Sequence, residues 1–171
     1  SGGWTPAVHL FTQSGGKLKY KEEGDFFIPN TYPSDQLSIG ACNGDLFLDE
    51  ILNNIPLALK DFLKINNTIY QNLEVISLAN KSKRNIWLLP SDKILGKTKS
   101  FVDFQNDATA KDIKLALREG FRSIEHVKRY TTTGMGTDQG KLGNMHALGI
   151  IADTAGVKMG ELGTTTFRPP Y

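Results

Sequence analysis

The chain has 171 residues, 39% of them hydrophobic, so it is long enough to bury one core or two small ones. Its net charge of +2 is too small to indicate nucleic acid as a ligand. It has no apolar run long enough to cross a membrane and no secretory signal, which favours a cytoplasmic protein. The single cysteine, Cys42, excludes an internal disulfide and a cysteine-ligated metal site. The three histidines lack metal-ligand spacing, so no metal site is expected.

Residues 1–62 resemble the end of an α/β unit. The apolar residues 7–11 predict a short strand, and Ser14, Gly15 and Gly16 predict the turn that follows it. Residues 37–41 predict a buried strand. A helix is expected next, with apolar side chains at helical spacing between Leu48 and Phe62 and a kink at Pro56.

The passage from that strand into the helix contains Gly40, Ala41 and Gly44. A strand, a glycine turn and a helix in this order often lie beside the pyrophosphate of a dinucleotide, so these residues are candidates for the dinucleotide side of a site. A purely structural turn between strand and helix explains the same pattern equally well. Both interpretations stay open from these residues.

Residues 63–100 predict a connector with one strand near Ile86–Leu89 and a basic loop over 93–100. Residues 101–163 predict a compact helical domain. Thr109 and Asp112 have the spacing of a capping box, and the helix they begin is expected to stop at Gly120. Further helices are predicted over 123–130 and 142–155, with one more turn over 157–162. The fold class is therefore α+β: a partial α/β nucleotide-binding segment followed by a small helical domain.

The most informative segment is the loop over residues 130–141, between two of the predicted helices. It combines three consecutive threonines with three glycines, and Lys128, Arg129 and Lys141 flank it. A glycine-rich loop ahead of a helix presents backbone N–H groups and the positive end of the helix dipole, which suits a phosphate. No Gly-Lys-Ser/Thr triplet follows the glycines, so the loop is not a Walker A motif. It predicts a site for an anionic cofactor.

Long stretches of the chain resemble the alpha subunit of heterotetrameric sarcosine oxidases. The resemblance covers most of the chain except roughly residues 60–95. It is carried by residues 1–4, 8–11, 13–16, 40–41 with 44, 101–107, 118–120, 123–132, 134–141 and 163–171.

The resemblance implies a place in a larger enzyme. In that family the alpha subunit has a dinucleotide-binding part that holds NAD, a small helical domain, and a C-terminal domain similar to an aminomethyltransferase. Residues 1–62 would be the end of the first part, 101–163 the second, and 164–171 a linker to the missing third. The beta subunit of that family carries FAD and a covalently attached FMN, with FMN at the boundary with alpha. The reaction implied is the oxidative demethylation of sarcosine to glycine.

The helical domain also resembles bacterioferritin-associated-ferredoxin-like modules, which bind a [2Fe–2S] cluster through four cysteines. Asp103 and Gln105 stand at the first cysteine pair of that pattern, and the second pair falls near Asp138 and Gly143. Since a cluster needs thiolates, none is expected here. In the other half, Ala41 replaces an acidic residue that flavoprotein disulfide-reductase-like enzymes use on the flavin ribityl chain. This fits NAD better than FAD.

The resemblance therefore implies two sets of site residues and no catalytic residue. The FMN side comprises Lys128, Arg129, Thr131, Thr132, Thr133, Gln139 and Lys141, and the dinucleotide side comprises Gly40, Ala41 and Gly44. Partners would be the beta subunit, together with the other subunits of the heterotetramer, and neither nucleic acid nor membrane. The isolated chain is expected to be inactive and to hold no cofactor. Two alternatives stay open: the alpha subunit of a related amine dehydrogenase, and a non-enzymatic docking module.

Overall fold

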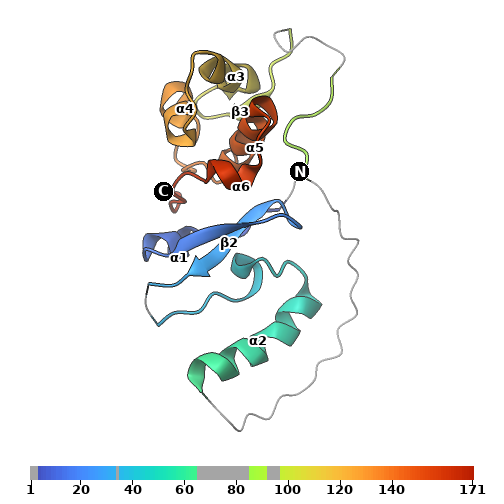
Figure 1. Ribbon diagram of the computed structural model, residues 1–171, viewed down its shortest axis with the longest axis vertical. Coiled ribbons are helices and arrows are strands. Elements are labelled where there is room, and N and C mark those ends of the chain that lie inside the picture. The colour runs from blue at the N-terminus through green and yellow to red at the C-terminus, as the bar shows by residue number, and fades with distance from the viewer. Residues whose placement is uncertain (1–3, 34, 65–84, 92–96) are drawn as a thin grey trace. The chain divides into compact units, whose positions relative to one another are not determined.

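The computed structural model describes residues 4–33, 35–64, 85–91 and 97–171. The chain divides into two compact units. The described part of the N-terminal unit is residues 4–33 and 35–64, and that of the C-terminal unit is residues 85–91 and 97–171. Helices alternate with two small antiparallel sheets of two strands each (Figure 1), so the predicted α+β class is confirmed.

The N-terminal unit is built on a hairpin of β1 (Lys17–Lys21) and β2 (Phe26–Thr31). Asp25 makes the turn possible: it adopts a left-handed φ of 53°, and its carboxylate accepts a hydrogen bond of 2.9 Å from the Tyr20 hydroxyl. The short helix α1 (His9–Gln13) precedes the hairpin. Its Phe11 ring meets Tyr32 edge-on at 4.9 Å between centroids. The small core of this unit contains Val8, Phe11, Phe26 and Phe27.

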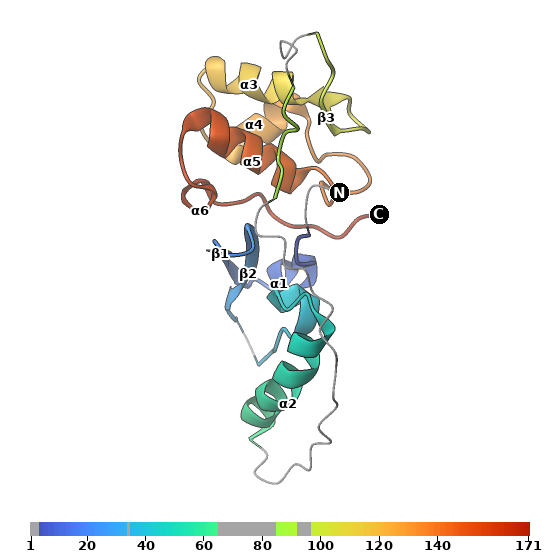
Figure 2. The same ribbon diagram turned by 90° about the vertical axis from the view of Figure 1, so that its right-hand side faces the viewer.

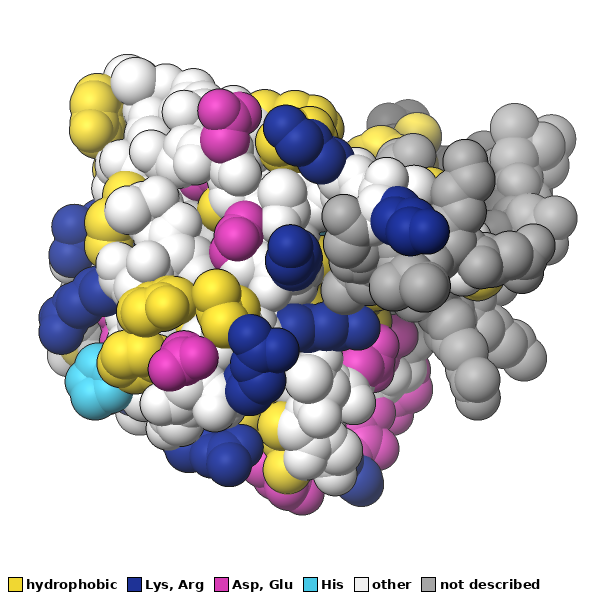
Figure 3. Space-filling view, turned by 90° about the horizontal axis from the view of Figure 1, so that it is seen from above, with side chains coloured by type: hydrophobic (Ala, Val, Ile, Leu, Met, Phe, Trp, Pro, Cys, Tyr) yellow, Lys and Arg dark blue, Asp and Glu magenta, His cyan; other side chains and the backbone are white. Residues whose placement is uncertain are grey.

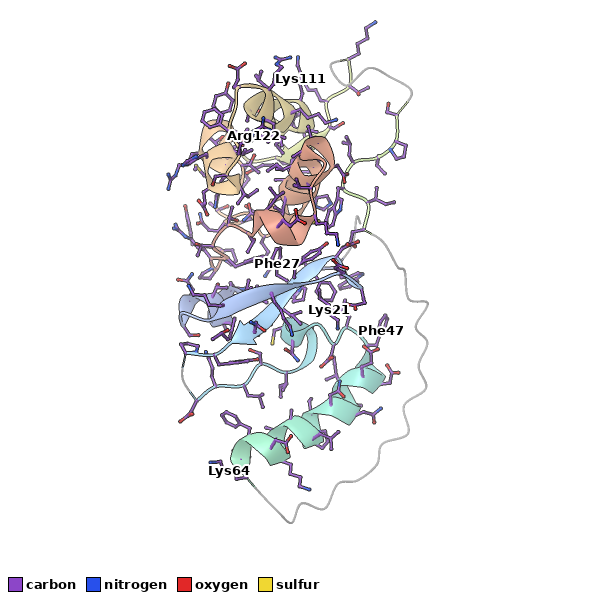
Figure 4. The ribbon with its side chains drawn as sticks, in the orientation of Figure 1. Lys21, Phe27, Phe47, Lys64, Lys111 and Arg122 are labelled. Carbon is purple, nitrogen blue, oxygen red and sulfur yellow. The ribbon has the colours of Figure 1, made fainter. Side chains whose placement is uncertain are left out.

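A 3₁₀ turn, η1 (Gly40–Asn43), leads to α2 (Leu48–Leu63). Phe47 precedes this helix, and Lys64 ends it in a left-handed conformation (Figure 4). The helix forms over the predicted residues and contains Pro56. None of its residues is buried, although its sequence is amphipathic.

The C-terminal unit begins its regular structure with β3 (Phe101–Asp103), which pairs with β4 (Ala108–Thr109). Helix α3 (Ala110–Arg118) starts directly after β4 because Thr109 caps it. The Thr109 hydroxyl accepts from the Asp112 N–H at 3.4 Å, and the Asp112 carboxylate accepts from the Thr109 N–H at 2.8 Å. The predicted capping box is confirmed. Gly120, two residues past the helix, has φ +97°.

Helices α4 (Ile124–Thr131), α5 (Asn144–Ala155) and α6 (Met159–Leu162) complete this unit (Figure 2). Helix α3 packs against both α4 and α5, and α6 packs against α5. The core consists mainly of apolar side chains that these helices direct toward each other: Ile113, Ala116, Leu117, Val127, Leu148, Ile150 and Ile151. All the predicted helices of this unit are confirmed, with bounds shifted by up to two residues.

Three predicted strands are wrong. Residues 9–11 belong to α1, residues 37–39 form no strand and Gly40 begins η1, and the described residues 85–91 contain no strand. Each prediction rested on an apolar run of about five residues. Such a run lacks the length to distinguish strand from helix or loop. The first part of the predicted basic loop, residues 93–96, lies outside the described residues.

Among the described residues, no helix combines the length and hydropathy needed to cross a bilayer.

Candidate functional site

The threonine–glycine loop connects α4 to α5. Thr132 ends α4 with a left-handed φ of 57°, Gly134 follows with φ +72°, and Gln139 has φ 50°. A positive φ is uncommon for any residue with a side chain, and for a β-branched threonine it is an outlier. The loop therefore contains unfavourable backbone dihedral angles, which contacts with other residues must stabilise.

Asp103, at the end of β3, provides those contacts. Its carboxylate accepts from the backbone N–H groups of Gln105 at 2.9 Å, Asn106 at 3.1 Å and Gly134 at 2.6 Å, and from the Asn106 side chain at 3.1 Å. The side chain is buried, with 6% of its surface exposed. Burial alone would raise the pKa of Asp103, but these four donors outweigh it and lower the pKa below its usual range. Asp103 is thus an ionised internal anion that holds the loop at Gly134.

The threonine hydroxyls are also engaged within the protein. Thr131 donates to the Val127 carbonyl at 2.8 Å, and its oxygen lies 2.7 Å from that of Thr133. Because a hydroxyl has one hydrogen, Thr133 is the donor in the second contact. Both side chains are buried. Thr132 is exposed and donates to the Thr131 carbonyl at 2.6 Å.

The glycines of the loop leave space for neighbouring atoms that a side chain would collide with. A Cβ at Gly134 or Gly140 would collide with the side chain of Asn144, the first residue of α5. A Cβ at Gly143 would lie 2.7 Å from the Val102 carbonyl oxygen. Asn144 itself is buried and its amide reaches the Gln139 carbonyl at 3.5 Å. Close approach of β3 and α5 to the loop accounts for these glycines without a ligand.

The remaining predicted FMN-side residues lie at the surface. Arg129 and Lys141 are exposed, whereas Lys128 and Gln139 are half-buried. The Gln139 amide donates to the Gly136 carbonyl at 2.8 Å. A cavity beside Lys128 and Thr133 measures about 10 Å³, which leaves room for one water and none for a phosphate. Arg129 and Lys141 are therefore the loop cations that a large anion could reach.

A larger cavity, of about 190 Å³, lies between β3 and the start of α5, and we call it the β3–α5 cavity. Its lining includes Asp103 and Gln105, which the predicted resemblance to cluster-binding modules places at the first cysteine pair, and Asp138 and Gly143, which it places near the second. The fold thus gathers all four around one space. Gln105 links two of its walls, because its side chain accepts from the Asp138 N–H at 3.5 Å and donates to the neighbouring Thr137 hydroxyl at 2.7 Å. Among the described residues, no group of three or more His, Cys, Asp or Glu side chains could hold a metal ion.

The dinucleotide-side candidates lie in the other unit. Gly40 and Gly44 are buried with φ of +72° and +89°, and Ala41 is exposed. A Cβ at Gly44 would lie 2.9 Å from both Ile28 and Phe26, so this glycine lets η1 approach the hairpin. The two glycines have structural reasons of their own, and the strand expected before them is absent. Their role toward a dinucleotide stays a prediction.

The face seen from above in Figure 3 carries both Lys and Arg side chains and Asp and Glu side chains, so it has no single-sign field. Lys111 at the start of α3 and Arg122 ahead of α4 lie at this end of the C-terminal unit (Figure 4). An electrostatic funnel for a polyanion would need one sign over such a face.

The C-terminal unit is similar to a domain of a known protein family. Residues 97–171 match the sarcosine oxidase A3 domain. The whole chain is similar to the sarcosine oxidase alpha subunits of Rhizobium meliloti (strain 1021), 36% identical over 182 residues, and of Corynebacterium sp. (strain P-1), 34% over 178. The chain spans 17% and 18% of those proteins. A shorter match, 36% over 64 residues, covers 37% of the chain and 14% of an opine oxidase subunit of Rhizobium meliloti (strain 1021).

The fold also has a counterpart among solved structures. An L-proline dehydrogenase from P. horikoshii matches with a TM-score of 0.56 at 17% identity, over 97% of this chain and 35% of that one. At 17% identity the similarity concerns the fold alone. Part of a dehydrogenase chain therefore has a similar fold. Because all of this chain is 34–36% identical to sarcosine oxidase alpha subunits, it belongs to the sarcosine oxidase alpha subunit family and corresponds to part of such a subunit.

Sequence reasoning finds the loop and misses the residues that organise it. In the sequence, Asp103 stands out only as the counterpart of a cysteine, and nothing marks Asn144. The contact of Asp103 with Gly134 joins residues 31 positions apart, and such distances leave no periodic signal. The one available signal is the density of glycines ahead of α5, which predicts close backbone approach.

Proposed function

We propose that the chain is part of the alpha subunit of a flavin-dependent sarcosine oxidase, an enzyme that oxidatively demethylates sarcosine to glycine. The observation that carries this proposal is the similarity of the whole chain to proteins named as alpha subunits of sarcosine oxidase. In the complete enzyme the partner is a beta subunit, FMN lies at the boundary between the two subunits, and NAD lies in the complete alpha subunit. We place the whole enzyme in the cytoplasm.

Within this proposal the loop contributes charge toward the FMN phosphate. FMN itself would supply the redox chemistry when bound. Arg129 and Lys141 are exposed and carry donors suited to a dianionic phosphate. Thr131, Thr133 and the Gly134 N–H have internal acceptors, so their role is to fix the backbone from which the cations project. Lys128, Thr132 and Gln139 complete the proposed flavin-facing side.

A double substitution tests the phosphate role. The complete complex should be rebuilt with Arg129→Ala and Lys141→Ala, and its FMN content and its electron transfer from FAD to FMN measured. We expect both FMN content and the rate of electron transfer from FAD to FMN to fall, because two charge-assisted contacts disappear. The matched control is Lys111→Ala with Arg118→Ala, two exposed cations of α3. Normal flavin loading and transfer in the first double variant would remove the phosphate role.

The isolated chain provides a second test. It should produce no peroxide from sarcosine and should retain no flavin after purification, because the proposed site needs another subunit. Anaerobic reconstitution with iron and sulfide should yield no cluster absorbance, since Cys42 is the single thiol. Peroxide formation by the pure chain would contradict the proposed division of labour.

A related amine dehydrogenase is the second candidate. The match to an opine oxidase subunit favours it, as does the fold likeness to an L-proline dehydrogenase. Turnover of sarcosine, an opine and L-proline by one preparation of the complete enzyme separates the two. A third alternative, a docking module without any flavin role, predicts a complex whose FMN content ignores Arg129 and Lys141.

A further inference from the structure

The rim of the β3–α5 cavity is apolar although it is exposed. Phe101 and Phe104 stack with their ring centroids 5.6 Å apart and their planes 30° from parallel. Phe104 is 75% exposed and Leu142, on the α5 side, is 74% exposed. A stacked aromatic pair beside an exposed leucine is a grouping that marks contact surfaces on soluble proteins.

The interior of the same cavity is acidic. Asp103 and Asp138 both line it, whereas none of the described residues that line it is Lys or Arg. Asp103 is saturated, because its two oxygens accept four donors. Asp138 is different: one oxygen accepts from the Gly140 N–H at 3.1 Å and the other from the Leu142 N–H at 3.2 Å. Each oxygen therefore keeps a lone pair for a further donor.

A cavity lined both by an aromatic pair and by a carboxylate with two available lone pairs matches one chemical group well. A guanidinium stacks on aromatic faces and donates two parallel hydrogen bonds to a carboxylate. A volume of about 190 Å³ is many times the roughly 10–15 Å³ that one water needs, which leaves space for a long side chain. Lys99 shows that a cation can approach this aromatic pair, since its ammonium lies 5.8 Å from the Phe101 ring centroid.

We propose that Phe101, Phe104 and Leu142 form a docking surface for another subunit of the enzyme, which places an arginine against the stacked aromatic pair and onto Asp138. The inference rests on the proposed function, since it takes the chain to be part of a multisubunit oxidase. It adds a surface and a partner chemistry that the loop cations do not define. Charge complementarity selects a basic segment, and the full-length relatives' names as subunits supply the class of partner.

The first test measures assembly of the complete alpha subunit with its partner subunits. Phe104→Ser combined with Leu142→Ser should weaken the association constant at least roughly tenfold, and Asp138→Asn should weaken it about fivefold and reduce its dependence on salt. All three side chains are exposed or half-buried, so their substitution leaves the buried core unchanged, although Asp138→Asn keeps only one of the two acceptor oxygens that hold the loop. The control is Val157→Ser, an exposed apolar residue just past the opposite end of α5. Circular dichroism checks the fold of each variant.

The second test identifies the occupant. A photo-reactive amino acid at position 104 of the complete subunit should cross-link, in the assembled enzyme, to a peptide of a different subunit that contains arginine. Cross-links only to a second copy of the alpha subunit, or to a segment without a basic residue, would overturn the proposal. Wild-type assembly of the Phe104→Ser, Leu142→Ser variant would overturn it as well.

The two proposals fail separately. Normal assembly of the rim variant, together with FMN loss in the Arg129→Ala, Lys141→Ala variant, would remove the docking surface and leave the proposed function. Suppose instead that the enzyme contains no FMN and does not turn over sarcosine, and that the Phe104→Ser, Leu142→Ser variant assembles weakly. The docking surface would then stand and the proposed function would be removed.

Discussion

The two units differ in how far they bury an apolar helix. In α5 of the C-terminal unit, Leu148, Ile150 and Ile151 are at most 2% exposed. In α2 of the N-terminal unit, Leu48 and Leu57 are 61% and 62% exposed, and no residue of the helix is buried. Apolar spacing predicts both helices correctly. Burial depends on which other elements the unit contains, and sequence spacing carries no information about them.

The cause lies in the neighbours of each helix. Helix α5 is covered by α3 and α6, and α3 also packs on α4. Helix α2 contacts the 3₁₀ turn η1. A helix whose apolar face has no cover contributes little to stability, because most helical stability comes from packing that face. Substitutions in the two units test this contrast.

Shortening a core side chain of α5 should have the largest effect. Leu148→Ala should reduce the free energy of unfolding of the C-terminal unit by about 3 kcal/mol, because it leaves a cavity in a closed core. Trp87 reports on this unit, since its ring meets that of His146 in α5 at 5.8 Å. Urea unfolding followed by Trp87 fluorescence, with Trp4→Phe in the background, measures it. A loss below about 1 kcal/mol would show that the core is loosely packed.

Removing the charge of Asp103 comes second. Asp103→Asn should cost about 2 kcal/mol at neutral pH, because hydrogen bonds to a charged group are lost at a buried site. The lowered pKa sets the sign of the pH dependence: this stability is present above about pH 4, the ordinary aspartate value, and is lost as pH falls through the lower folded pKa. The difference between wild type and variant should therefore shrink in acid. Asp107→Asn, an exposed neighbour in a left-handed turn, is the control.

The helix caps give a smaller, local effect. Thr109→Ala should cost about 1 kcal/mol, because it removes the capping box of α3. Ser123 occupies the same position ahead of α4 but makes no side-chain cap, so Ser123→Ala should cost less. Equal losses for the two variants, measured by thermal unfolding, would mean that the capping hydrogen bonds contribute nothing.

The smallest effect is expected in α2. Leu57→Ala should change stability by less than about 0.5 kcal/mol, as exposed substitutions usually do. Amide hydrogen exchange should likewise be faster in α2 than in α5, because exposed helices open locally. A loss as large as that of Leu148→Ala would show that another surface covers α2 in solution, and the contrast between the units would disappear.

Local signals in the sequence predict much of the C-terminal unit. The capping box at Thr109 and the helical spacing in α3, α4 and α5 act within one or two turns, so they are visible in a short window. The wrong strand predictions rest on short segments. Residues 7–11 and 37–41 are apolar runs of five residues, which are too short to show a helical or strand period. The anchoring of the loop could not be predicted, because Asp103 meets Gly134 across 31 positions through tertiary packing.

The candidate site illustrates the same division. Its exposed cations, Arg129 and Lys141, are identified directly from the sequence. Thr131 and Thr133 donate their hydroxyl hydrogens to acceptors within the protein, and only the three-dimensional structure reveals these acceptors. Residue type indicates donors in that loop, whereas geometry decides which of them remain available to a ligand.

The left-handed backbone of Thr132 has a practical consequence for anyone evolving this protein in the laboratory. A β-branched residue at φ 57° costs of order 1 kcal/mol relative to glycine or asparagine. A library screened only for heat tolerance should therefore enrich glycine or asparagine at position 132. A library screened for retention of FMN by the complete enzyme should keep threonine if its exposed side chain faces the cofactor. Sequencing both libraries at this single codon would separate what the backbone prefers from what the ligand requires.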